Sequence, residues 1–234
     1  MRAVFLHAFG ADRLSWAGTT PSLPDIECAT PDLPGHGSKI NDLDDGSLTD
    51  LADRVTVDIG DERSWLVGHS LGGSIALQVA TQSPEQCEGL ILLCPLGLGS
   101  TANLERVISY PGIASKDEMR FFLEWLVVKT AIIADQFVDY GFDQLEIPGA
   151  RDALAKIAGN LSKIADETRS SLAAIEEAKI DVTIVWGADD PICVPDRDLI
   201  RPHWDLHVLP EVGHIPHVEA MKDVNALLRS KLVP

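Results

Sequence analysis

A serine between two glycines is the residue of this sequence best suited to nucleophilic chemistry. Ser70 stands in the segment VGHSLGG at residues 67–73, a Gly-x-Ser-x-Gly pattern that includes Gly68 and Gly72. The pattern follows a predicted strand and precedes a predicted helix, so we expect the serine on a sharp turn that exposes its hydroxyl. Side chains in place of the two glycines would collide with the neighbouring strand and helix. The spacing therefore predicts a serine nucleophile that attacks a carbonyl group.

A serine hydroxyl needs a base, and the base needs a carboxylate that fixes its tautomer. Both residue types follow Ser70 in the expected order. His214 lies in VGHIP at residues 212–216, after the last predicted strand, and Asp190 lies in WGADDP at residues 186–191, after the strand before it. We predict His214 as general base and Asp190 as the orienting acid. Asp189 is the alternative acid, although Asp190 is favoured because it directly precedes a proline.

Acyl transfer also requires hydrogen-bond donors for the oxyanion that forms on the attacked carbonyl. The backbone N–H of Leu71, the residue after the nucleophile, is the first expected donor. The second is the backbone N–H of Phe9, in the segment LHAFG at residues 6–10 after the first predicted strand. The helix that begins behind Ser70 adds a partial positive charge at the same place.

Short apolar segments bounded by turn residues predict the strands that position these groups. They are residues 3–7, 26–30, 64–67, 90–94, 182–186 and 206–209. Their continuous hydrophobicity is typical of parallel strands that are covered on both faces. Helical periodicity is expected at residues 71–81 and 221–232. Because the carboxyl ends of parallel strands gather at one edge of a sheet, this arrangement brings the three candidate residues together.

The alternation of strands and helices stops between about residues 97 and 178. The helices predicted there are near residues 117–128, 131–141, 149–161 and 165–178. We therefore expect an α/β core of residues 1–96 and 179–234 and a helical lid of residues 97–178. His7 from the core and Phe121 and Trp125 from the lid are predicted to line a substrate pocket. The alternative for the two lid aromatics is the core of the lid itself.

The composition limits the classes of partner. The chain has 36 Asp and Glu against 19 Lys and Arg, a formal net charge of -17, which would repel nucleic acid. No apolar run approaches the ~20 residues of a membrane span, and the N-terminus does not resemble a signal peptide, so we expect a cytoplasmic protein. The 4 cysteines lack the spacing of a metal or redox motif, and free thiols are expected. We expect no metal, no cofactor, a small-molecule acyl substrate, and a monomer or homodimer.

Taken together, the motifs resemble the α/β-hydrolase superfamily over nearly the whole chain. The matching segments are VFLHAFG at residues 4–10, DLPGHGS at 32–38, GHSLGG at 68–73 and GHIPHVE at 213–219. The resemblance implies the same triad and oxyanion donors as the residues do. It also implies an α/β fold with a mostly parallel sheet of about six strands, lacking the first two strands of the family and carrying an inserted lid. Ala8 departs from the glycine that usually follows the histidine in this family.

A closer similarity is to the hydrolase-like domain fused to the acyltransferase component of acetoin dehydrogenase complexes. It is carried by DLPGHG at residues 32–37, DGSL at 45–48 and CPLGLG at 94–99. The sequence has no lipoyl-bearing segment, which favours a free-standing hydrolase over a subunit of such a complex.

The leading hypothesis is a serine hydrolase that cleaves a small carboxylic ester or thioester through an acyl-enzyme on Ser70. Related enzymes on this scaffold cleave lactones or carbon–carbon bonds or transfer acyl groups, and fold alone does not choose among them. A ligand-binding protein that kept the fold without catalysis is the alternative from a different class. Haloalkane dehalogenases and epoxide hydrolases are disfavoured, because they resemble this family but need an aspartate in place of the serine.

Overall fold

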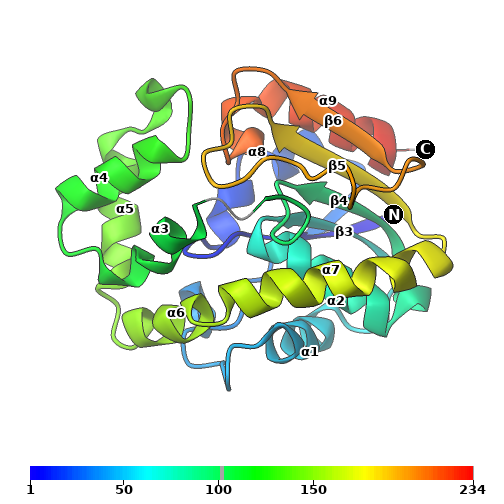
Figure 1. Ribbon diagram of the computed structural model, residues 1–234, viewed down its shortest axis with the longest axis horizontal. Helices are drawn as coiled ribbons and strands as arrows, with labels where there is room; N and C mark the ends of the chain where they lie inside the picture. Colours follow the sequence, from blue (N-terminus) through cyan, green and yellow to red (C-terminus); the bar gives the residue numbers. More distant parts are fainter. Residues whose placement is uncertain (101–102, 234) are drawn as a thin grey trace.

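A parallel β-sheet lies at the centre of the computed structural model, which describes residues 1–100 and 103–233 (Figure 1). Its strands are β1 (Arg2–Leu6), β2 (Glu27–Ala29), β3 (Ser64–His69), β4 (Cys87–Leu93), β5 (Asp181–Gly187) and β6 (Asp205–Leu209). They lie in the order β2-β1-β3-β4-β5-β6, and every neighbouring pair is parallel. The predicted parallel sheet of about six strands flanked by helices is confirmed.

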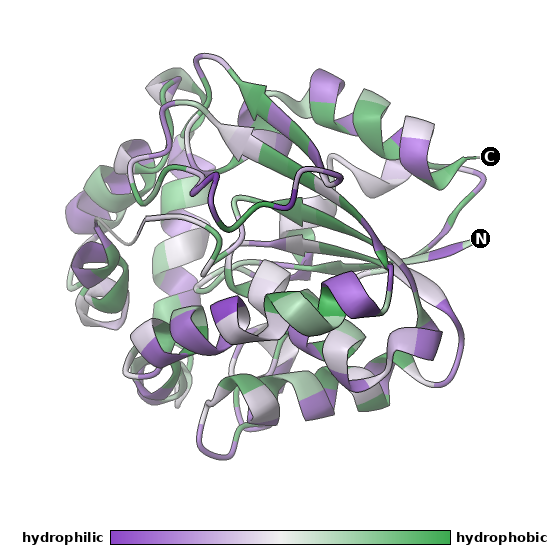
Figure 2. Ribbon diagram, turned by 45° about the vertical axis from the view of Figure 1, so that its right-hand side comes forward, coloured by the Kyte–Doolittle hydropathy of each residue, from purple (hydrophilic) through white to green (hydrophobic). Residues whose placement is uncertain are grey.

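The sheet separates two hydrophobic cores, because successive residues of a strand point to opposite faces. In β1, Val4 belongs to the larger core and Phe5 to the smaller one. The helices on the side of the larger core are α1 (Leu48–Ile59), α2 (Leu71–Gln82) and α7 (Leu161–Glu177), and α9 (Met221–Leu232) covers the smaller core. Figure 2 shows mostly hydrophobic strands between helices that carry both hydrophilic and hydrophobic residues. Burial on both faces explains why the inner strands, such as β3 and β5, show no alternation of apolar and polar residues.

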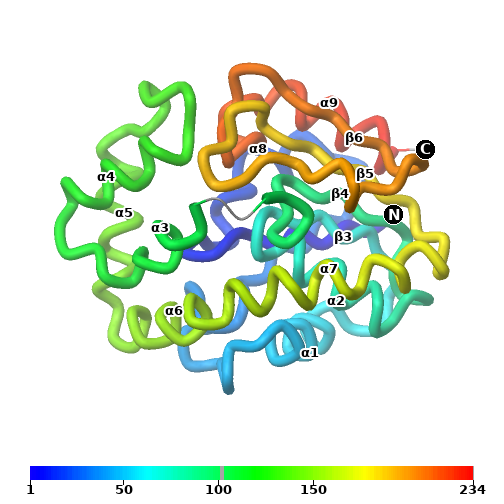
Figure 3. Tube along the Cα trace, in the orientation of Figure 1, coloured from blue at the N-terminus to red at the C-terminus, as the bar shows by residue number. Residues whose placement is uncertain are grey.

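The chain between β4 and β5 is helical. Its helices are α3 (Leu104–Ile108), α4 (Lys116–Trp125), α5 (Asp135–Leu145), α6 (Ala150–Ala158) and α7. The trace in Figure 3 shows α3 to α6 beyond the carboxyl ends of the strands, whereas α7 runs beside α2 along the sheet. The predicted lid of residues 97–178 therefore includes a helix that flanks the core. Residues 101–102 of that range lie outside the described residues.

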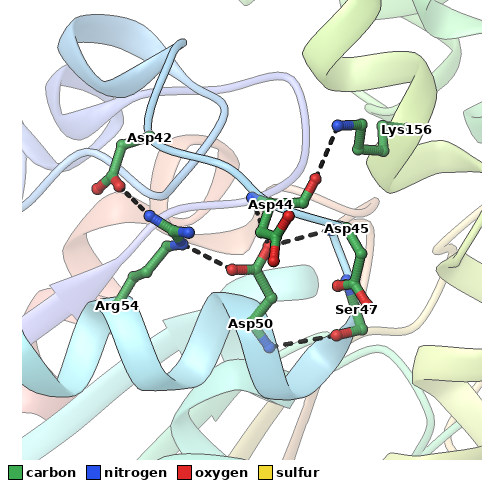
Figure 4. Close-up of polar contacts among 8 residues, drawn as sticks. Asp42, Asp44, Asp45, Ser47, Asp50, Arg54 and Lys156 are labelled. Carbon is green, nitrogen blue, oxygen red and sulfur yellow. Dashed lines mark hydrogen bonds and ion pairs between the residues drawn. The ribbon is translucent and has the colours of Figure 1, made fainter.

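The loop before α1, which contains Asp42, Asp44 and Asp45, connects α6 to the core through hydrogen bonds (Figure 4). Asp50, in the first turn of α1, accepts a hydrogen bond from the backbone N–H of Asp44 at 3.0 Å and pairs with Arg54. Lys156 of α6 donates to the carbonyl oxygen of Asp44 at 2.7 Å. Part of the acidic composition thus orders a connection between α1 and the helices beyond the strand ends.

After β6, the short helix α8 (Pro216–Glu219) leads into α9.

The cysteines carry free thiols, as the spacing predicts; they are Cys28, Cys87, Cys94 and Cys193. Within residues 1–100 and 103–233, no helix has the length and apolar character needed to cross a membrane.

Candidate active site

Ser70 occupies a strained turn between β3 and α2. Its φ of 51° lies in the left-handed region that favours glycine. A Cβ atom on Gly72 would lie 2.3 Å from the carbonyl oxygen of Leu6, and one on Gly68 would lie 2.4 Å from that of Gly72. Both glycines are therefore required by the close approach of strand and helix. This is the geometry of a nucleophile elbow, in which the serine stands at the top of the sheet.

His214 and Asp190 meet at the carboxyl ends of β6 and β5. The Nδ1 atom of His214 lies 2.8 Å from Oδ2 of Asp190, whose side chain is fully buried. The other carboxylate oxygen accepts from the backbone N–H groups of Ile192 at 2.8 Å and Cys193 at 3.3 Å. Burial alone would raise the pKa of Asp190, but the attraction of His214 and these hydrogen bonds lower it below its ordinary value. Asp189 is exposed, so the geometry favours Asp190 as the acid.

The residue before Ser70 connects the serine turn to the histidine loop. His69 donates from Nε2 to the carbonyl oxygen of His214 at 2.7 Å. Burial, followed by the nearby His217 and His214, lowers the pKa of His69 well below its ordinary value. A neutral imidazole at this position fixes the distance between the two loops without adding a charge beside the predicted base.

Two other buried histidines hold the loop that carries Phe9. Nε2 of His7 accepts from the backbone N–H of Leu33 at 2.9 Å, and Nε2 of His36 accepts from that of Gly10 at 3.1 Å. Burial lowers the pKa of His7 to about 4 and that of His36 to about 3, so both stay neutral acceptors at neutral pH. His7 has no exposed surface, and this placement favours a structural role over the predicted pocket-lining role.

The two predicted oxyanion donors lie at the start of α2 and in the loop after β1, as the oxyanion role requires. Leu71 is the first residue of α2, and Phe9 follows β1 by three residues. In the described part of the chain, neither backbone N–H donates to a protein acceptor. Both groups are therefore available to an external oxygen atom.

The lid aromatics contact an arginine. The guanidinium carbon of Arg106 lies 4.5 Å from the ring centre of Phe121 and 4.3 Å from that of Trp125. The two rings thus join α4 to α3, and Phe121 is 69% exposed. The contact between these helices and the Phe9 loop is made instead by Tyr110, whose hydroxyl donates to the carbonyl of Gly10 at 3.1 Å.

One group among the described residues could offer metal ligands, namely Cys94, Asp190 and His214, whose ligand atoms lie within 4.8 Å of one another. Burial, with the nearby Asp190, raises the pKa of the Cys94 thiol well above its ordinary value. A protonated thiol is a poor metal ligand, and Asp190 and His214 already share a hydrogen bond. The chemistry of this group therefore fits an acid–histidine pair better than a metal site.

A cavity of about 380 Å³ lies away from these residues. It is lined by parts of β1, α1 and the loop after β2, including Arg2, Asp32 and Asp58. Both carboxylate oxygens of Asp32 already have hydrogen-bond partners within the protein, because they accept from the backbone N–H groups of Arg13 and Ser38, both at 2.9 Å. The lining of this cavity includes none of Ser70, Asp190 and His214, which lie at the strand ends.

Sequence comparison decides the family. The profile described as the alpha/beta hydrolase family matches residues 3–227. The chain belongs to the alpha/beta hydrolase family. Solved structures share the fold. The 2-hydroxy-6-oxo-6-phenylhexa-2,4-dienoate hydrolase from Rhodococcus sp. strain RHA1 has a TM-score of 0.85 at 21% identity, covering 100% of this chain and 90% of that one. A meta-cleavage product hydrolase from Pseudomonas fluorescens IP01 has a TM-score of 0.83 at 21% identity, covering 97% and 89%.

Two curated relatives of this chain are named for different activities. The acetyltransferase component of the acetoin cleaving system of Pseudomonas putida is 28% identical over 228 residues, which are 95% of this chain and 60% of that protein. The chain thus spans less than two thirds of this relative, and the predicted resemblance to such components is confirmed. The 2-succinyl-6-hydroxy-2,4-cyclohexadiene-1-carboxylate synthase of Escherichia coli K12 is 29% identical over 240 residues, covering 96% and 91%.

Two residues beside the predicted triad had no role in the site predicted from the sequence. Cys94 directly follows β4 and lies next to Asp190, and Glu219 accepts from the backbone N–H of Gly213 at 2.6 Å. The available signal for Glu219 was an acid in an otherwise apolar segment, five residues after His214.

Proposed function

We propose that this protein is a serine hydrolase that cleaves small carboxylic esters or thioesters through an acyl-enzyme on Ser70. The observation that carries the proposal is the buried pair of Asp190 and His214, with 2.8 Å between Oδ2 and Nδ1, at the sheet edge where Ser70 stands on its strained turn. An ionised carboxylate on Nδ1 holds the tautomer in which Nε2 can accept a proton.

The first half-reaction forms the acyl-enzyme. Oγ of Ser70 attacks the carbonyl carbon while Nε2 of His214 takes the hydroxyl proton. The oxyanion accepts hydrogen bonds from the N–H groups of Phe9 and Leu71, each worth about 3 kcal/mol in the transition state. When the tetrahedral intermediate collapses, the bond to the alcohol or thiol breaks, and His214 returns the proton to the leaving group.

The second half-reaction releases the acid. A water molecule attacks the acyl carbon while His214 takes its proton, and the bond to Oγ of Ser70 breaks as the proton returns to the serine. The products are a carboxylic acid and the free enzyme. Asp190 stays ionised throughout, because its pKa lies below its ordinary value.

A second candidate is hydrolysis of a carbon–carbon bond on the same triad. The relative from Escherichia coli, 91% of which this chain covers, is named as the synthase of a cyclohexadiene carboxylate and not as an esterase. The Rhodococcus protein of the same fold is named for a substrate with a 6-oxo-6-phenyl group and no ester. In this candidate the same serine is required, and the scissile bond joins the carbonyl carbon to a carbon atom.

The experiment that tests both candidates compares wild type, Ser70→Ala and the exposed control Ser230→Ala. Each is assayed with p-nitrophenyl esters of increasing acyl length, acyl thioesters and 2-hydroxy-6-oxo-6-phenylhexa-2,4-dienoate. Ester or thioester turnover that is lost only in Ser70→Ala supports the proposal, and turnover of the ketone alone supports the second candidate. No turnover of any substrate, together with no reaction with a fluorophosphonate, overturns both in favour of a binding protein.

A further inference from the structure

One carboxylate joins the loop of His214 to the chain that follows α4. Glu219, at the end of α8, is buried, and its Oε2 accepts from the backbone N–H of Gly213 at 2.6 Å. Its Oε1 accepts from the backbone N–H groups of Val128 at 2.8 Å and Lys129 at 2.9 Å. Hydrogen bonds to an ionised acceptor are roughly twice as strong as neutral ones. A single side chain therefore holds three backbone groups from two distant parts of the sequence.

The same two segments also touch each other directly. We name residues 126–129, which follow α4, the strap. The backbone N–H of His214 donates to the carbonyl oxygen of Leu126 in the strap at 2.7 Å. A Cβ atom on Gly213 would lie 2.4 Å from that same oxygen and 2.9 Å from Oε2 of Glu219. The strap and the histidine loop are therefore packed as one unit with Glu219 between them.

We propose that Glu219 is a positioning residue that sets the place of the His214 imidazole by clamping its backbone against the strap. The proposal rests on the proposed function, in which His214 is the base. Asp190 controls the rotation and tautomer of the ring, whereas Glu219 controls the position of the backbone from which the ring projects. Because the strap belongs to the helical insertion, its contact with Glu219 makes the placement of the base depend on the insertion being docked.

The carboxylate form is what allows all three hydrogen bonds. Each oxygen of a carboxylate accepts, whereas glutamine has one accepting oxygen and an NH₂ group that only donates. In Glu219→Gln, the NH₂ group faces either the N–H of Gly213 or the two N–H groups of the strap. Donors then face donors, so the hydrogen bonds on that side are lost and the two segments separate there. Aspartate keeps both oxygens but is one methylene shorter, and Glu219→Asp is expected to restore part of the effect.

The test uses the full chain and a matched control. Glu211→Gln removes the same charge from an exposed side chain in the same connection between β6 and α8. We measure the rate of fluorophosphonate labelling of Ser70, kcat and KM on the best ester, and the low-field ¹H NMR signal of the His214 Nδ1–H. Amide hydrogen exchange is followed for Gly213, Val128 and Lys129.

Glu219→Gln is expected to slow labelling and kcat at least tenfold with KM changed less than threefold, and to broaden or shift the low-field signal. Glu219→Asp recovers part of the rate, and Glu211→Gln matches wild type in every readout. In wild type, the three amides are expected to exchange at rates within a few fold of one another, because one carboxylate holds them all. This last measurement applies even if Glu219→Gln fails to fold.

Wild-type labelling and a wild-type NMR signal in Glu219→Gln would overturn the proposal, even if the strap exchanges faster. Exchange rates of the three amides that differ by orders of magnitude in wild type would also overturn it. If wild type neither labels nor turns over any substrate, the proposed function fails. The NMR signal and the exchange rates then still decide whether Glu219 positions His214.

Discussion

Asp190 is held on both of its oxygen atoms, one 2.8 Å from Nδ1 of His214 and the other in reach of two backbone N–H groups. The pair comes from the ends of the neighbouring strands β5 and β6. A carboxylate fixed in this way cannot turn away from the imidazole, and its lowered pKa keeps it charged at neutral pH. The tautomer of His214 is therefore determined by the fold.

Replacing the acid by its amide tests this relationship. In Asp190→Asn the side chain can present an NH₂ group to Nδ1, which favours the wrong tautomer, and kcat is expected to fall by on the order of 10³ to 10⁴. Asp189→Asn is the matched control, because the adjacent carboxylate is exposed, and we expect less than a twofold change. Steady-state kinetics on the best substrate check this. Equal losses in the two variants would show that Asp190 is not the acid.

The serine turn is expected to be intolerant of a single methyl group. In Gly72→Ala the new Cβ would lie 2.3 Å from the backbone oxygen of Leu6, so strand and helix must separate. We expect a loss of unfolding free energy of about 1–3 kcal/mol or more, measured by urea denaturation. Gly112→Ala is the control, since no atom lies within 4 Å of its added Cβ. A Gly72→Ala variant as stable as this control contradicts the turn geometry.

Buried histidines make stability depend on pH. Burial lowers the pKa of His7 to about 4, and those of His36 and His217 to about 3. In the unfolded chain histidine titrates near 6.5, so below that pH the unfolded state binds more protons than the folded state. The contribution is fully present above pH ~6.5 and is lost as pH falls toward about 4 for His7 and about 3 for His36 and His217, by up to about 1.4 kcal/mol per pH unit per histidine. Urea denaturation at pH 7.5, 6.0 and 5.0 measures this slope, and equal stability at all three values rules it out.

Tyr140 is expected to hold α5 to the core loop after β1. Its hydroxyl donates to the carboxylate of Asp12, which also accepts from the backbone N–H of Leu14 at 2.7 Å. Tyr140→Phe removes this bond, so we expect KM to rise about two- to tenfold, corresponding to about 1 kcal/mol, with little change in kcat. Hydrogen exchange in residues 135–145 should accelerate, whereas the exposed control Gln136→Ala should leave it unchanged. Unchanged KM and exchange in Tyr140→Phe would mean that the bond does not hold the helix.

Local sequence patterns predicted the parts of the fold whose physical cause is itself local. Short apolar segments identified all the strands of the described sheet, and they are continuous in the inner strands because both faces of those strands are buried. The glycines around Ser70 identified the turn, because only a residue without Cβ fits there. The strand ends of β5 and β6 then placed Asp190 and His214 side by side.

The remaining features depend on contacts between distant segments. The apolar stripe of α7 is the same whether the helix covers the sheet or a lid, so the sequence could not show that it packs beside α2. The hydrogen-bond partner of buried His7 is the backbone N–H of Leu33, a group with no sequence signature. Glu219 likewise binds backbone groups, one of them 91 residues away, and such partners are invisible in the sequence.

Covalent labelling with a fluorophosphonate, followed by peptide mapping, tests the proposed serine chemistry most directly. We expect one adduct, on the peptide that contains Ser70, absent in Ser70→Ala and formed at least 100-fold more slowly in His214→Ala. A wild-type protein that forms no adduct, or a Ser70→Ala variant that still reacts at the wild-type rate, would contradict the assignment of Ser70 as a nucleophile activated by His214.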